Sequence, residues 1–89
     1  MNKNNFPFNL RSYRKDLGLS LEQLSKKTGI SFSTLGYYER GLKSPTLYSL
    51  LILADFFNFT LNDLCAEEFA PFSEEDKEKI FGKIKENKN

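Results

Sequence analysis

The chain has 89 residues, of which 39% are hydrophobic and 28% charged, so we expect one globular domain rather than a disordered segment. Its 13 Lys and Arg nearly balance its 12 Asp and Glu, and its single cysteine, Cys65, excludes an internal disulfide. No segment approaches the ~20 apolar residues of a membrane span, and the first ten residues lack the apolar run of a signal peptide, so we expect a cytoplasmic protein. Without His, a cluster of metal ligands or a glycine-rich phosphate loop, the sequence predicts neither enzyme activity nor a metal or cofactor site.

Glycine and capping residues divide the chain into short predicted helices. The first lies in NLRSYRKDLG, where apolar residues recur at helical spacing and Gly18 ends the pattern. The second begins at Ser20, which has Gln23 at the capping-box position three residues later, and it ends at Gly29. A tight turn is therefore expected after each of these helices.

Three more helices are predicted from capping residues and glycines of the same kind. The third begins at a Ser31 cap and ends at Gly41. The fourth begins at Thr46, and its apolar face is expected to comprise Leu47, Leu50, Leu51, Ala54 and Phe57. The fifth lies in TLNDLC, capped by Thr60. Because no segment shows the alternation of a half-buried strand, we predict an all-α fold of five helices, with residues 1–65 as one domain.

The second and third helices are joined by a short turn that contains Gly29, which is the spacing of a helix-turn-helix. Leu35 and Tyr38 are expected to face inward, and the small Ser25 lets the two helices approach closely. The remaining positions of the third helix are free: Phe32, Ser33, Gly36, Tyr37 and Arg40. In helix-turn-helix geometry these positions enter the major groove of DNA.

The free positions carry few of the Arg, Asn and Gln side chains that usually read bases. The Phe32 ring can contact thymine methyl groups, the Ser33 hydroxyl can bond to either type of base, and the Tyr37 phenol can also reach a base edge. We therefore predict base contacts from Phe32, Ser33, Gly36 and Tyr37. An alternative for Phe32 is a hydrophobic staple or a surface aromatic residue without a ligand.

Charge is distributed unevenly along the chain. Residues 1–45 carry eight Lys and Arg against three Asp and Glu, a net charge of +5, whereas residues 46–89 carry five against nine, a net charge of −4. A basic half is typical of proteins that bind a polyanion, and this agrees with double-stranded DNA as the partner. Chance segregation of solvated charge is the alternative.

Residues 10–64 resemble the five-helix domain of the phage repressor and Cro type, the Xre family. The resemblance rests on an ordered set of short motifs: Arg14 four residues before Gly18, Gly-Ile-Ser at 29–31, Glu-Arg-Gly at 39–41, Pro45, and FNFTLNDL at 57–64. It implies a sequence-specific transcriptional regulator that binds a palindromic operator as a dimeric repressor, through the helix at 32–40.

The resemblance also implies roles for individual residues. Contacts to DNA phosphates are expected from Ser20, Leu21, Ser31, Thr34, Arg40 and Lys43. Leu21 stands where relatives often have a glutamine, so its contact would come from backbone N–H groups at the helix N-terminus. Arg14 and Glu39 are implied to form a partly buried ion pair, which would compensate an acid placed near a helix C-terminus.

Residues 66–89 lie outside the resemblance, and SEEDKEKIFGKIKENKN predicts a helix at 73–86 capped by Ser73. The segment contains the apolar residues Phe69, Phe72, Ile80, Phe81 and Ile84, which are too apolar to remain in water. They either fold back on the domain's own core or bury against a second copy, and we expect a homodimer formed via residues 60–89. A protein-interaction module or antitoxin with the same fold, and therefore a protein partner, is the alternative function.

Overall fold

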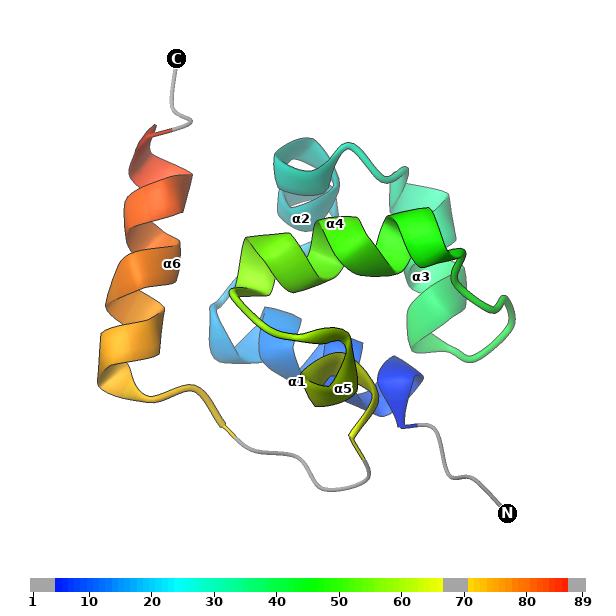
Figure 1. Cartoon of the computed structure of the whole chain (residues 1–89). Helices are drawn as coiled ribbons and strands as arrows, with labels where there is room; N and C mark the ends of the chain where they lie inside the picture. The colour runs from blue at the N-terminus through cyan, green and yellow to red at the C-terminus, as the bar shows by residue number, and fades with distance from the viewer. Residues whose placement is uncertain (1–4, 67–70, 87–89) are drawn as a thin grey trace.

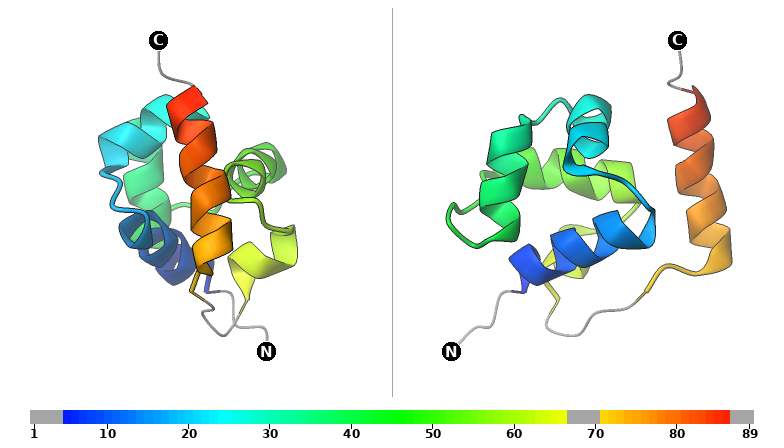
Figure 2. Two further views of the ribbon diagram at one scale, coloured as in Figure 1. Left: turned by 90° about the vertical axis from the view of Figure 1, so that its left-hand side faces the viewer. Right: turned by 180° about the vertical axis from the view of Figure 1, so that it is seen from behind.

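The computed structural model describes residues 5–66 and 71–86, and this part of the chain contains six helices (Figure 1). They are α1 (Phe6–Asp16), α2 (Leu21–Thr28), α3 (Phe32–Glu39), α4 (Leu47–Phe57), α5 (Leu61–Cys65) and α6 (Glu74–Glu86). The first five helices pack together, and α6 stands beside them at one edge of the molecule, as the two further views also show (Figure 2). The predicted all-α fold class is confirmed.

The predicted helix caps are present. Ser20 Oγ accepts a hydrogen bond from the Gln23 backbone N–H, and Gln23 Oε1 accepts one from the Ser20 N–H, which closes the capping box at the start of α2. Thr60 and Asp63 form the same box at α5. At the end of α2, Gly29 adopts the left-handed backbone (φ 80°) that directs the chain into α3.

The first helix begins one turn earlier than predicted. Pro7 lies in the first turn, where a backbone N–H has no hydrogen-bond partner within the helix. The lack of an N–H on proline therefore breaks no helical bond, and the helix can begin at Phe6. The Phe6 side chain is only 1% exposed, and its ring meets Tyr38 edge to face with centroids 5.7 Å apart. The buried Asn9 donates hydrogen bonds to the carbonyls of Leu64 and Ala66, which ties α1 to the end of α5.

The buried face of α4 differs from the predicted one. Ala54 and Phe57 are buried as expected, but Leu47 and Leu51 are 63% and 50% exposed. Leu53 and Phe56 take part in the core, and Leu50 is packed partly against it. Almost every position of LYSLLILADFF is apolar, so its periodicity could not select a face, and packing against the neighbouring helices decides it.

The C-terminal segment packs on the domain's own core. Phe72 is buried, and its ring stacks on Phe59 with an interplanar angle of 13° and contacts Tyr13 at 5.0 Å between centroids. Ile80 is also buried, and Ile84 packs partly against the same core. These residues are therefore packed on the domain's own core, which was the first of the two alternatives, rather than left free for a second copy. A dimer interface in residues 60–89 therefore cannot use Phe72 and Ile80 while they hold this position.

Two lysines fix α6 to other helices. Lys83 Nζ donates to the Asp55 carbonyl and to Asn58 Oδ1 at the end of α4, and Lys27 Nζ of α2 donates to the Ile84 carbonyl. Such bonds place a cation at a helix C-terminus, where it interacts favourably with the helix dipole. Phe81 remains 38% exposed, and Phe69 lies outside the described residues.

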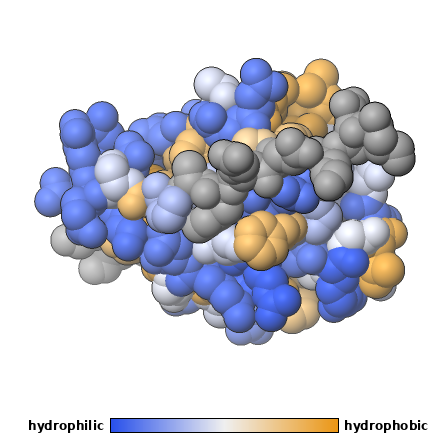
Figure 3. Space-filling view, turned by 90° about the horizontal axis from the view of Figure 1, so that it is seen from below, coloured by the Kyte–Doolittle hydropathy of each residue, from blue (hydrophilic) through white to orange (hydrophobic). Residues whose placement is uncertain are grey.

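Seen from below, the surface is mostly hydrophilic, with separate hydrophobic areas rather than one continuous apolar face (Figure 3). None of the helices described here combines the length and the apolar character needed to cross a membrane.

Candidate nucleic-acid interface

The inner face of α3 is fixed to the core. Leu35 is fully buried and Tyr38 is 3% exposed. The Tyr38 hydroxyl also donates to Ser49 Oγ of α4 at 3.1 Å. Because this face is held by packing and by a hydrogen bond, the opposite face of α3 is presented in one orientation.

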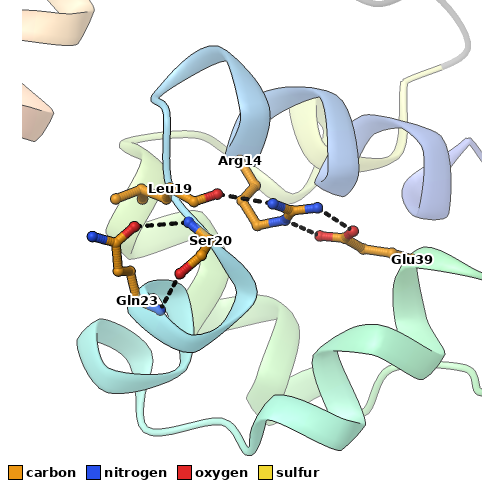
Figure 4. A network of polar contacts seen from close by, with 5 residues as sticks. All are labelled: Arg14, Leu19, Ser20, Gln23 and Glu39. Atoms are coloured by element: carbon orange, nitrogen blue, oxygen red, sulfur yellow. Dashed lines mark hydrogen bonds and ion pairs between the residues drawn. The ribbon is translucent and has the colours of Figure 1, made fainter.

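A polar network connects α1, the turn before α2 and the end of α3 (Figure 4). Arg14 binds the Glu39 carboxylate with two parallel bonds, Nε to Oε2 at 2.7 Å and Nη2 to Oε1 at 2.9 Å. Its Nη1 donates to the carbonyl of Leu19 at 2.8 Å. Hydrogen bonding to Glu39 raises the pKa of Arg14, although burial acts in the opposite direction. The Arg14 guanidinium therefore bonds both to the end of α3 and to the turn that leads into α2.

Three of the four predicted base-contacting residues, Phe32, Ser33 and Tyr37, are exposed on α3, whereas Gly36, which was expected to be free, is buried beneath neighbouring side chains. Phe32 is 51% and Tyr37 39% exposed. Ser33 is exposed between them in the sequence. With Gly36, Leu21 and Arg40, these residues line a shallow hollow of about 150 Å³. The helix thus offers apolar rings, a hydroxyl and a cation on one surface.

Two cations lie over the ring of Tyr37. Arg40 Cζ is 5.4 Å and Lys43 Nζ 5.7 Å from the ring centroid, within the ~6 Å range of cation–π contacts. Both residues were predicted to contact phosphates. Together with the Tyr37 ring, the two residues form a cationic patch at the end of α3.

The predicted phosphate contacts at the helix starts lie on capping residues. Ser31 Oγ accepts from the Thr34 N–H at 3.1 Å and is 2.8 Å from Thr34 Oγ1, so both hydroxyls are engaged within the cap. Ser20 is likewise engaged with Gln23. A phosphate at these ends would therefore meet mainly backbone N–H groups. Leu21 is partly buried, and its side chain lines the hollow beside Gly36.

Sequence reasoning missed Arg11. It is exposed on α1 and lines, together with Arg40, a second hollow of about 250 Å³ that adjoins the first at Leu21 and Gly36. Arg11 precedes Arg14 by three residues, so the two lie on the same side of α1. That spacing, combined with the implied contact of Arg14 to α3, was the signal that would have identified it.

Other reactive groups lie apart from this surface. Cys65 is partly buried at the end of α5, and this burial raises the pKa of its thiol. Within residues 5–66 and 71–86, no group of three His, Cys, Asp or Glu side chains is placed to hold a metal ion.

Comparison with known proteins places the chain in a family. Residues 10–64 match the family model HTH_3, described as helix-turn-helix. The chain is 42% identical over 53 residues to YobD, an uncharacterized HTH-type transcriptional regulator of Bacillus subtilis (strain 168), covering 60% of this chain and 47% of that protein. It is 37% identical over 59 residues to the HTH-type transcriptional regulator AnsR of the same organism, covering 66% of this chain and 51% of AnsR. The chain thus spans about half the length of these two relatives.

Two further comparisons extend to other organisms. An uncharacterized HTH-type transcriptional regulator of Archaeoglobus fulgidus is 33% identical over 55 residues, which cover 62% of this chain and 79% of that protein. The crystal structure of a transcriptional regulator from Listeria innocua aligns with a TM-score of 0.68 over 99% of this chain and 82% of that one. At 19% sequence identity, this last likeness shows the fold alone.

Proposed function

Because this chain belongs to the HTH_3 family of Xre/Cro-type helix-turn-helix proteins, whose relatives are transcriptional regulators, we propose that it is a dimeric repressor that binds a palindromic operator through α3. The dimer follows from the operator: two copies related by a two-fold axis would place their α3 helices in successive major-groove turns, ~34 Å apart.

The observation that carries this proposal is the contrast between the two faces of α3. One face is buried through Leu35 and Tyr38, whereas the other exposes Phe32 and Tyr37 beside a cationic patch. A mixture of apolar rings and cations suits the major groove, where thymine methyl groups and base edges lie between two rows of phosphates.

The proposal is tested by titrating the chain against its selected operator and a scrambled duplex at two salt concentrations. Lys43→Ala should weaken binding to both duplexes and reduce the salt slope by about one unit for each phosphate that the protein no longer neutralises. Ser33→Ala and Phe32→Ala should cost about 1–3 kcal/mol on the operator and little on the scrambled duplex. Lys79→Ala removes an exposed cation of α6 as a matched control and should change neither titration.

Tyr37 needs two variants because its ring and its hydroxyl have separate roles. Tyr37→Phe retains the ring beneath Arg40 and Lys43, so it should lose only the discrimination that the hydroxyl contributes. Tyr37→Ala also releases both cations and should weaken binding to any sequence. If Phe32, Ser33 and both Tyr37 variants lose equally on the two duplexes, α3 does not read sequence.

A protein-interaction module is the second candidate, because α4 exposes a group of large apolar residues outside α3. Leu47, Tyr48 and Leu51 are 63%, 75% and 50% exposed and lie on one side of the helix. Exposed apolar groups of this kind are typical of protein interfaces. Salt-sensitive binding of the chain alone to operator DNA separates the two functions, since an interaction module would not show it.

A further inference from the structure

Gly36 occupies the middle of α3 without a conformational reason. The glycines with positive φ in the described residues are Gly18, Gly29 and Gly41, whereas Gly36 has the ordinary backbone of a helix. In a helix interior, glycine is less favourable than every other residue except proline. Alanine at this position would therefore stabilise the helical backbone of α3 more than glycine does.

Packing inside the protein does not require a glycine either. A Cβ atom placed on Gly36 would have Arg40 Nη1 at 3.6 Å and Leu21 Cδ1 at 3.9 Å as its nearest neighbours. Both distances are ordinary van der Waals contacts, and both atoms are the ends of flexible side chains. Gly36 itself is buried beneath these two side chains, and neither the backbone nor the packing excludes a methyl group there. A glycine at this position therefore leaves the hollow beside it free for a molecule that approaches from outside.

The walls of this space indicate what approaches. The Gly36 hollow, defined by Leu21, Phe32, Ser33, Gly36, Tyr37 and Arg40, has a volume of about 150 Å³. Leu21 and Phe32 are apolar, whereas Ser33 and Arg40 place hydrogen-bonding groups at the same site. The occupant should therefore be a small apolar group attached to a polar ring. In the major groove, this describes the 5-methyl group of a pyrimidine.

We propose that the Gly36 hollow reads the 5-methyl group of a pyrimidine in the operator, either thymine or 5-methylcytosine. This rests on the proposed function, because it needs α3 in the major groove. The methyl group enters the hollow between Leu21 and Phe32, beside Gly36. The Ser33 hydroxyl can donate to O4 of thymine or accept from the N4 amino group of cytosine, so it accommodates both rings.

This inference changes the role of Leu21. The residue was expected near a phosphate through the backbone of the α2 N-terminus, but its side chain forms a wall of the Gly36 hollow. A glutamine there would present an amide to the site, whereas leucine presents two methyl groups. In this proposal, Leu21 of α2 therefore contributes to the methyl-selective contact together with residues of α3.

The test compares bases that differ by the methyl group alone. Each thymine of one operator half-site is replaced in turn by uracil, and binding is measured by fluorescence anisotropy. One replacement should weaken binding ~4-fold, the factor for removing one buried CH₂-sized group. At that position, 5-methylcytosine opposite guanine should bind ~4-fold more tightly than unmethylated cytosine. If thymine shows the effect and 5-methylcytosine does not, the hollow reads thymine only, and the shared 5-methyl chemistry is overturned.

Two glycine variants connect this effect to the hollow. Gly36→Ala should raise the thermal midpoint of unfolding and reduce the ~4-fold preference for the methyl group to about 1, because the new Cβ fills the space. Gly82→Ala is the matched control: it lies in α6 with no atom within 4 Å of an added Cβ, so it should raise the midpoint and leave the preference unchanged. Leu21→Ala, which removes a wall, should also abolish the preference.

The outcomes separate this proposal from the proposed function. If the chain shows no salt-sensitive DNA binding, the function itself fails. If it binds its operator but no uracil replacement has an effect, or if Gly36→Ala keeps the preference, the methyl-reading hollow is overturned while DNA binding stands.

Discussion

Among single residues, Arg14 has the strongest structural constraint, because it bonds to Glu39 through two nitrogens and to Leu19 through the third. The Arg14 and Glu39 side chains are only 12% and 6% exposed, so either one without its partner would be a poorly solvated charge. Arg14→Met should lower the free energy of unfolding by about 3–5 kcal/mol, measured by urea denaturation. Arg14→Met combined with Glu39→Leu should recover much of this loss.

The matched control is Arg11→Met, which removes an exposed arginine one turn earlier in the same helix. It should change the free energy of unfolding by no more than about 0.5 kcal/mol. An Arg14→Met protein that unfolds at the urea midpoint of the wild type would show that the pair contributes nothing to stability.

Cys65 gives a second prediction at this scale, because burial raises the pKa of its thiol. The folded protein then keeps the thiol proton at a pH where the unfolded chain has released it. This contribution to stability is fully present below the ordinary thiol pKa of about 8.5 and is lost as the pH rises through the folded-state pKa. The stability difference between wild type and Cys65→Ala should therefore shrink between pH 7 and pH 10 in urea titrations. A difference that grows over this range would contradict the direction of the shift.

Among the helices, local patterns predicted the caps and the inner face of α3, but only part of the buried face of α4. Ser20, Ser31, Thr46 and Thr60 cap their helices as expected, since a cap depends on residues three positions apart. The exposure of Leu47 and Leu51 on α4 could not be predicted, because an apolar residue stands at nearly every position of that helix. The early start of α1 was not predicted either, because no side-chain cap marks its first residue.

The placement of α6 leads to a prediction about Phe72. Its ring is buried against Phe59 and Tyr13, so it completes an aromatic cluster between α1 and the end of α4. Phe72→Ala should cost about 3–5 kcal/mol of unfolding free energy, measured by thermal and urea denaturation. Phe81→Ala removes the same ring from a site that is 38% exposed and should cost clearly less. Equal losses for the two variants would mean that the segment does not pack as described.

At the scale of the whole molecule, the sequence predicted only those residues of the candidate site that lie on α3. Phe32, Ser33, Gly36 and Tyr37 were predicted together from their spacing on α3, and they line one hollow, although Gly36 itself is buried. Leu21 was assigned a phosphate contact, and Arg11 was not identified. Their positions in the site depend on how α2 and α1 approach α3. The Arg14–Glu39 pair spans 25 residues and entered only through the family resemblance. Long-range geometry of this kind has no periodic signal in a single sequence.

Assembly depends on which apolar surfaces the fold leaves exposed. The sequence indicated residues 60–89, but Phe72 and Ile80 are buried within the chain, which leaves Phe81 as a half-exposed ring on α6. On α4, Tyr48 is 75% exposed between Leu47 and Leu51, and this surface carries no charge among those three residues. Two copies can bring these uncharged side chains together about a two-fold axis.

We therefore predict that α4 contributes the dimer contact. Three side chains supply on the order of half of the ~800 Å² per partner in a standard interface, so the homodimer should be weak and strengthened by operator DNA. Size-exclusion chromatography with light scattering, run with and without operator, should show that Tyr48→Asp is monomeric and that Phe81→Asp behaves as the wild type. Tyr48→Asp should retain its affinity for a half-site and lose the additional affinity for the full palindrome, because each monomer still presents α3. A wild-type chain that stays monomeric on the operator, or dissociation caused by Phe81→Asp alone, would exclude the α4 interface.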